Sequence, residues 1–221
     1  MLRHPRASLR SWSALHISTD ESGRVFDVIT RQLTSLDSRI SHVNNDTTTL
    51  RDARASDRAT IAALTMRAYA EYARVMTPAA WAALEGALRR SLADDTGVSR
   101  IVAEHEGRIV GSVALYDPGH AQYTGLDSAA AWPEVRLVAV DPSVRGRGVA
   151  RALVLECVRR ARAAGAPTLG LHTSQSMHTA RRLYERLGFV RDPDHDFQPP
   201  GGEQVEGYQL PLDDPAPHPE S

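Results

Sequence analysis

The segment best suited to chemistry is a strand-turn-helix junction, V140-D-P-S-V-R-G-R-G-V-A150, whose turn holds two glycines and two arginines. Glycine tolerates positive φ and lets another group approach the backbone closely. The free amides at the start of a helix point outward together and carry partial positive charge. With Arg145 and Arg147 beside these amides, the junction is predicted to bind a ligand that carries several phosphates.

A dinucleotide fingerprint fits this junction poorly. That fingerprint, G-x-G-x-x-G, requires a third glycine and an acidic residue roughly twenty positions later. Here Gly146 and Gly148 are followed by Arg151 at the place of the third glycine, and the later region reads A-P-T-L-G, without an acid. A nicotinamide oxidoreductase is therefore a weak alternative, and affinity for NAD would reveal it.

Two motifs in order resemble a known family, the GNAT superfamily of acetyl-CoA-dependent N-acetyltransferases. Its pyrophosphate motif, Q/R-x-x-G-x-G/A, is matched in register by Arg145, Gly148 and Ala150. Its second block, a helix ending in L-Y-E-R-L-G-F, is matched by residues 183–189, with a strand between the two blocks. The resemblance covers the chain from residue 49 to residue 212.

The resemblance implies an enzyme that transfers the acetyl group of acetyl-CoA, its cosubstrate, directly to a primary amine of a small molecule or peptide. It implies an α/β fold in which helices flank both faces of a central mixed β-sheet. The backbone N–H of Val140 would be the oxyanion donor. Cofactor binding is assigned to Val138, Ala139, Val140, Arg145, Gly146, Arg147, Gly148, Val149 and Ala150.

Glu134 is the candidate general base. It stands on the strand that enters the junction, six residues before Val140, where histone-acetylating members of the family place a catalytic glutamate. Strand alternation predicts that Glu134, Arg136, Val138 and Val140 share one face. A structural ion pair between Glu134 and Arg136 is the alternative role, and His120, His172 and Asp117 are the alternative bases.

Tyr184 is the candidate general acid, since a phenol with a pKa of about 10 suits a thiolate leaving group. Its alternative role is a core residue packed beside Phe189.

Met177 departs from the family pattern, because members often carry an asparagine there that holds the pantetheine arm or the acceptor. The backbone or Ser174, Gln175 or Ser176 would have to substitute. The departure keeps open a second function, a catalytically reduced acyl-CoA-binding regulatory module. The aromatic residues expected to line an acceptor site are Tyr69, Tyr72, Trp81 and Tyr123.

Composition excludes several other classes. The 221 residues carry 26 basic and 27 acidic side chains, a balance that does not indicate a nucleic-acid partner. All the basic residues are arginine, which excludes a Walker lysine, a pyridoxal Schiff base and a lysine base. The lone Cys157 excludes an internal disulfide and is expected to be a buried, inert thiol. We expect no metal site, no membrane partner and a cytoplasmic location.

The elements needed to position these residues can be read along the chain. Ser56 is expected to cap the first core helix, and Thr77-Pro78 to begin the second. Two strands around Glu106-Gly107 form a hairpin. The expected strands are 49–55, 100–105, 108–116, 134–140, 168–173, 189–191 and 204–210, and the expected helices are 57–75, 78–93, 147–164 and 178–187.

Residues 1–48 are expected to be an extension that precedes the acetyltransferase domain at 49–212, with a disordered tail at 213–221. The Arg- and Ser-rich start resembles a transit peptide, and a disordered extension or an early start codon is the preferred alternative. Apolar residues at three- and four-residue steps predict a helix over 24–42. Its apolar face is expected to dock on its own domain or on a second copy in a homodimer.

Overall fold

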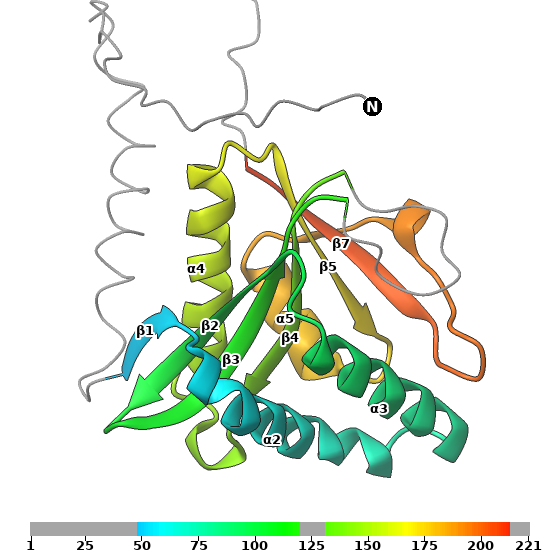
Figure 1. Cartoon of the computed structure of the whole chain (residues 1–221). Coiled ribbons are helices and arrows are strands. Elements are labelled where there is room, and N and C mark those ends of the chain that lie inside the picture. The colour runs from blue at the N-terminus through cyan, green and yellow to red at the C-terminus, as the bar shows by residue number, and fades with distance from the viewer. Residues whose placement is uncertain (1–47, 120–130, 213–221) are drawn as a thin grey trace, which may run out of the picture. The chain divides into compact units, whose positions relative to one another are not determined.

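The computed structural model describes residues 48–119 and 131–212. The expected helix at 24–42, the tail at 213–221 and the candidates His120 and Tyr123 lie outside the described residues. Within these two ranges, seven strands form one mixed sheet in the order β1-β2-β3-β4-β5-β7-β6 (Figure 1). The strands are β1 (Thr48–Asp52), β2 (Val98–His105), β3 (Arg108–Tyr116), β4 (Glu134–Val140), β5 (Thr168–Ser174), β6 (Val190–Arg191) and β7 (Val205–Pro211).

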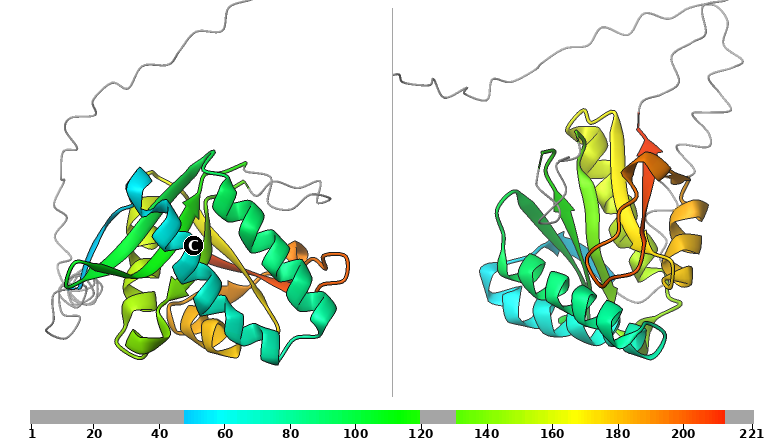
Figure 2. Two further views of the ribbon diagram at one scale, coloured as in Figure 1. Left: turned by 60° about the horizontal axis from the view of Figure 1, so that its bottom comes forward. Right: turned by 90° about the vertical axis from the view of Figure 1, so that its right-hand side faces the viewer.

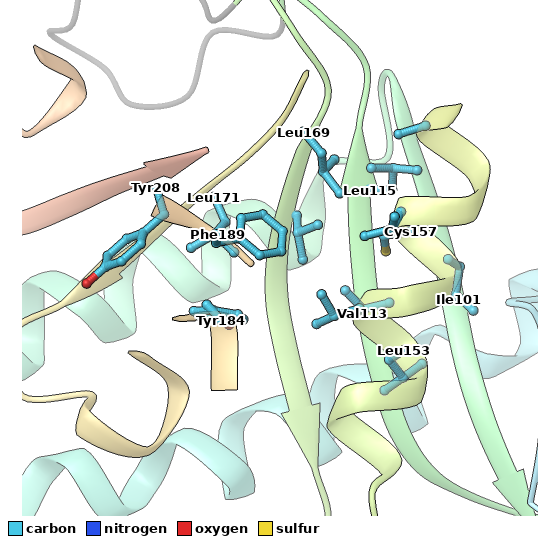
Figure 3. Close-up of a cluster of buried hydrophobic side chains, with 14 of the residues drawn as sticks. Ile101, Val113, Leu115, Leu153, Cys157, Leu169, Leu171, Tyr184, Phe189 and Tyr208 are labelled. Carbon is cyan, nitrogen blue, oxygen red and sulfur yellow. The ribbon is translucent and has the colours of Figure 1, made fainter. Parts of the chain in front are cut away.

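Helices cover both faces of this sheet, which confirms the expected fold class. Helices α2 (Arg58–Tyr69) and α3 (Pro78–Ala93) lie on one face, and α4 (Val149–Ala163) and α5 (His178–Arg186) on the other (Figure 2). The main core lies between α4, α5 and the sheet, and Figure 3 shows Leu153 and Cys157 of α4 facing it. No helix in the described ranges is long and apolar enough to cross a bilayer.

The predicted N-terminal cap is confirmed for α3 and is wrong for α2. The Thr77 hydroxyl accepts a hydrogen bond from the Ala80 N–H at 3.2 Å and so caps α3, as expected. Ser56 does not cap α2, because a 3-10 turn, η1 (Ala55–Asp57), comes first and places Asp57 at the cap position. Helix α2 ends at Tyr69 and continues as a second 3-10 segment, η2 (Ala70–Arg74).

Strands β4 and β5 are the parallel pair in the sheet, and they part soon after they meet. Their register contains Glu134 opposite Gly170 and Val135 opposite Leu171, with no pair beyond these in the described residues. The remaining length of β4 therefore has β3 on one side and no strand partner on the other. This opening faces the junction that leads into α4.

A bulge in β4 changes which side chains share a face. Leu137 has φ of 54°, and the pairing with β3 shifts register at this point. Val138 and Val140 pack against the main core with α4, whereas Leu137 packs in the cluster beneath α2. The expectation that Glu134 and Arg136 share a face with Val138 and Val140 is therefore wrong, because the extra residue reverses the alternation.

Gly111 of β3 allows the first turn of α4 to lie close to the sheet. A Cβ at this position would lie 2.8 Å from Val149 Cγ1 and 3.0 Å from Leu153 Cδ1. The position of the helix start therefore depends on a residue without a side chain.

Candidate active site

The N-terminus of α4 is an open set of backbone donors. Gly146 and Gly148 have φ of 78° and 81°, a conformation that side chains disfavour. Gly148 is the N-cap, no described side chain caps the helix, and the Ala152 N–H bonds to the Gly148 carbonyl at 2.9 Å. The N–H groups of residues 149–151 are thus available to an anion at the positive end of the helix.

Asp141 shapes the turn that leads to these amides. Its carboxylate accepts hydrogen bonds from the Ser143 N–H at 3.0 Å and the Ser143 hydroxyl at 2.7 Å. Arg67 of α2 donates to the same carboxylate at 3.1 Å. These donors, with Ser143 foremost, lower the pKa of Asp141.

Arg145 is exposed, and its guanidinium lies against the end of α2. Its guanidinium donates to Glu71 Oε2 at 2.5 Å and to the Ala68 carbonyl at 3.0 Å. The side chain thereby fastens the glycine turn to the end of α2, and its charge is shared with Glu71. Arg147 is exposed on the same turn.

The edge of β4 that faces the gap offers another donor. The Asp141 N–H bonds to Val110 of β3 at 2.9 Å. Because successive N–H groups of a strand alternate in direction, the Val140 N–H points away from β3, toward the gap beside β5. Ala139 lies opposite Ser112 of β3 and is buried. Val138 and Val140 are half-buried.

A cleft of about 750 Å³ opens between α3, the parted strands and the segment that leads into β7. The α3 wall is mainly small and apolar, and the wall from the strands is polar. Tyr69 of α2 is part of the lining. The strand-side wall includes Tyr116, Arg136, His172, Thr173, Ser174, Phe197 and Glu203.

Glu134 is enclosed next to this cleft, with 2% of its surface exposed. Arg136 donates to Glu134 Oε2 from Nε at 3.0 Å and from Nη2 at 2.9 Å. The other oxygen lies 3.3 Å from His172 Nδ1. Arg136 in turn lies over the Tyr116 ring, 4.3 Å from its centroid. The ion pair between Glu134 and Arg136 is confirmed, and it leaves Glu134 behind the cleft wall.

His172, an alternative base, makes a hydrogen bond through one ring nitrogen, and its other ring nitrogen lies near the Glu134 carboxylate without a hydrogen bond. Nε2 lies 2.9 Å from the carbonyl oxygen of His195. Because a carbonyl only accepts, Nε2 carries a proton, and Nδ1 faces the Glu134 carboxylate. The ring also meets Phe197 edge-on at 5.3 Å. His172 therefore contributes ring surface to the cleft while its nitrogens serve the buried network.

Trp132 packs beside the network formed by Glu134, Arg136 and His172, and it was not among the residues predicted for the site. Its indole lies against Gly170, where a Cβ would be 2.8 Å from the indole Cδ1. It also contacts the His195 ring, 4.9 Å between centroids. A glycine inside a buried strand is the available signal, because it marks a close approach without identifying the partner.

Tyr184 of α5 is buried beside Phe189, with 6.0 Å between the ring centroids (Figure 3). Burial raises the pKa of its phenol, and Tyr72 and Cys157 add to the effect. The phenol is therefore neutral at physiological pH and is a hydrogen-bond donor. The packing expected of a core tyrosine is confirmed, and the acid role stays a prediction.

Met177 fills an apolar cluster at the start of α5. It is buried with Met76 and Ala80, and the partly buried Tyr69, Tyr72 and Trp81 pack against them. Of the expected acceptor-lining aromatics in the described ranges, Tyr69 alone reaches the cleft wall. The thioether thus supplies packing where the family often has an amide.

The remaining residues singled out from the sequence are Cys157, Asp117 and the polar residues Ser174, Gln175 and Ser176. Cys157 is fully buried in α4, and burial raises the pKa of its thiol to about 12. Asp117 is exposed and lies outside the cleft wall. Ser174 lines the cleft, Ser176 donates to Glu203 at 2.6 Å, and Gln175 contacts Gln204 at 3.4 Å. Among the described residues, no cluster of three or more His, Cys, Asp or Glu is arranged to hold a metal.

Known acetyltransferases are similar to part of this chain. Mycothiol acetyltransferase from Nocardiopsis dassonvillei is 42% identical over 82 residues, 37% of this chain and 25% of the relative. The uncharacterized N-acetyltransferase YjgM from Escherichia coli is 35% identical over 88 residues, 40% of this chain and 48% of the relative. This chain thus spans about a quarter to a half of the length of these relatives.

A solved structure shows the same fold. The putative acetyltransferase yncA from Salmonella typhimurium, solved with its cofactor acetyl-CoA, aligns with a TM-score of 0.54 and 23% identity. The alignment covers 77% of this chain and 96% of that structure. A sequence profile of the Acetyltransferase (GNAT) family matches residues 63–189, more than half of the chain. The chain therefore belongs to the acetyltransferase (GNAT) family.

Proposed function

We propose that this protein is an N-acetyltransferase that moves the acetyl group of acetyl-CoA directly to a primary amine. The observation that carries the proposal is the parting of β4 and β5 beside the uncapped start of α4. The unpaired edge of β4 supplies backbone N–H donors, and the start of α4 supplies an anion site. Relatives named as acetyltransferases support the same reaction. The single buried thiol, which needs no oxidising compartment, supports a cytoplasmic location.

The described residues suit acetyl-CoA as cosubstrate. The amides of residues 149–151 and the glycine turn fit a diphosphate. Gly146 and Gly148 have open space where a Cβ would stand, so a ligand can approach their backbone. The β4 edge at Val138–Val140 is assigned to the pantetheine arm, and Arg145 holds the turn in place through α2. Bound acetyl-CoA supplies a thioester whose C–S bond breaks as the amine nitrogen bonds to the acyl carbon.

Three groups are assigned to the chemistry. The Val140 N–H stabilises negative charge on the acyl oxygen. Glu134 receives the proton of the attacking amine through water, because its 2% exposure prevents direct contact. The neutral Tyr184 phenol donates a hydrogen bond to the departing sulfur. Arg136 holds the Glu134 carboxylate in place through the ion pair between them.

The test is release of free thiol from acetyl-CoA in the presence of a panel of primary amines. We expect amine-dependent release with an acetylated product, and a slower reaction in Glu134→Gln across the pH range. Binding of CoA without release over the whole panel would contradict the proposal and favour a regulatory acyl-CoA-binding module.

A further inference from the structure

Glu203 is a carboxylate of the cleft wall, and only one of its two oxygens accepts a hydrogen bond from a described residue. Ser176 donates to Oε1 at 2.6 Å. Oε2 is buried and has no hydrogen-bond partner among the described residues. A buried oxygen without a donor is costly, and an ionised one more so. Since Glu203 belongs to the cleft wall, a ligand in the cleft can supply the missing donor.

The surrounding loop holds this carboxylate in position. The chain turns tightly at 199–202, where the Gly202 N–H bonds to the Pro199 carbonyl at 2.9 Å. Gln175 then bonds to Gln204 at 3.4 Å, next to the bond between Ser176 and Glu203. Two adjacent residues after β5 thus hold two adjacent residues before β7. A group fixed in this way is preorganised for binding.

Across the cleft, α3 presents mainly small and apolar side chains, with Arg90 and Ser91 lining the cleft near the end of the helix. Five lining residues at helical spacing form one face, which we call the α3 face: Ala80, Ala83, Leu84, Ala87 and Leu88. Helical periodicity places all five on the same side of α3. Met76, Met177 and Phe197 extend the apolar lining at the ends of this face.

Glu134 does not compete with Glu203 for a ligand. Arg136 and His172 already face its two oxygens, and it lies behind the wall. Glu203 instead has a free oxygen, and the complementary partner of a carboxylate is a cation with N–H donors.

We propose that Glu203 binds the ammonium of the acceptor while the α3 face holds its apolar body, so that the acceptor is an apolar or aromatic primary amine. This inference rests on the proposed acetyl transfer and names the substrate class of the same site. Glu203 acts in binding and orientation, and Glu134 keeps the role of base. Ser176 is a positioning residue, because it acts through the Glu203 carboxylate.

The test compares Glu203→Gln with Glu185→Gln, which removes an exposed carboxylate of α5 outside the cleft wall. The probe is 2-phenylethylamine, with ethanolamine as an amine that lacks an apolar body. We expect Glu203→Gln to raise the KM for 2-phenylethylamine about 10- to 100-fold, the effect of a lost charged hydrogen bond. The KM for acetyl-CoA should stay unchanged, and Glu185→Gln should match the wild type.

A second variant and two control measurements separate a loss of amine binding from a loss of folding. Ser176→Ala should raise the same KM by less, because the carboxylate remains. Thermal unfolding of each variant and its KM for acetyl-CoA show whether the fold is intact. An unchanged amine KM in a folded Glu203→Gln variant, or a fall in kcat alone, would overturn the ammonium-binding role. A wild-type preference for ethanolamine would overturn the apolar-body assignment.

Failure of the proposed function would give a different result. In that case the wild type transfers acetyl to no amine, and calorimetric titration with 2-phenylethylamine takes the place of kinetics. Saturable binding that weakens in Glu203→Gln and not in Glu185→Gln would support the inference even then. No binding to the wild type would refute it.

Discussion

The replacement Gly111→Ala tests whether the position of the α4 N-terminus depends on the glycine in β3. The added Cβ would lie 2.8 Å from Val149 Cγ1 and 3.0 Å from Leu153 Cδ1, where ordinary contact begins at 3.4 Å. Both neighbours are buried core residues, and Val149 is β-branched, so neither can turn aside freely. The strain must push the first turn of α4 away from the sheet by a few tenths of an ångström.

The magnitude follows from two opposing effects. Overpacking in a filled core costs about 1–3 kcal/mol. Replacing glycine in a strand interior returns roughly 0.5–1 kcal/mol of backbone entropy. We therefore expect the free energy of unfolding to fall by up to about 2.5 kcal/mol, and each kcal/mol lowers Tm by roughly 2–4 °C in a domain of this size. Because residues 149–151 supply the anion site, binding of acetyl-CoA should weaken as well.

The assay is thermal unfolding together with calorimetric titration of acetyl-CoA. The matched control is Gly86→Ala within α3, where the nearest atom to the new Cβ is the mobile end of Arg90 at 3.3 Å. This control should raise Tm, because alanine is worth about 0.5–1 kcal/mol over glycine inside a helix. A Gly111→Ala protein with unchanged Tm and unchanged acetyl-CoA affinity would refute the reasoning.

Three other predictions concern single side chains. Cys157, whose pKa is raised from 9.0 to about 12, holds roughly 10³-fold less thiolate than an ordinary thiol at pH 8. Iodoacetamide should therefore leave the native protein unmodified and label it once in denaturant; rapid native labelling would contradict this. Asp141→Ala should cost about 0.5–2 kcal/mol in urea unfolding at pH 7. Because folding lowers the pKa of Asp141, the difference from wild type should be full above about pH 4 and shrink as pH falls through the folded pKa; a constant difference would argue against the Ser143 bonds. Tyr184→Phe should lower kcat by about 10²-fold with little change in Tm, and an unchanged kcat would make Tyr184 a core residue only.

Features that depend on neighbouring sequence could be predicted well. The Thr77-Pro78 start of α3, the hairpin around Glu106-Gly107 and the bounds of β4 all follow from local turn chemistry and patterning. The anion site at the start of α4 is local too, since two glycines and a helix start define it.

Features that depend on distant partners could not be predicted. The bulge at Leu137 appears in the pairing of β4 with β3. The last four residues of β4 are all apolar, so the hydrophobic pattern does not show where the alternation changes. The contact of Trp132 with Gly170 joins residues far apart in sequence. The bond between Ser176 and Glu203 links two loops, and neither loop alone indicates a binding carboxylate.

The central claim is that the parted strands and the start of α4 form an acetyl-CoA site. It is tested most directly by calorimetric titration of the full chain with acetyl-CoA and, separately, with NAD. We expect saturable one-to-one binding of acetyl-CoA and no measurable binding of NAD. Equal or tighter binding of NAD, or no binding of acetyl-CoA, would contradict the account.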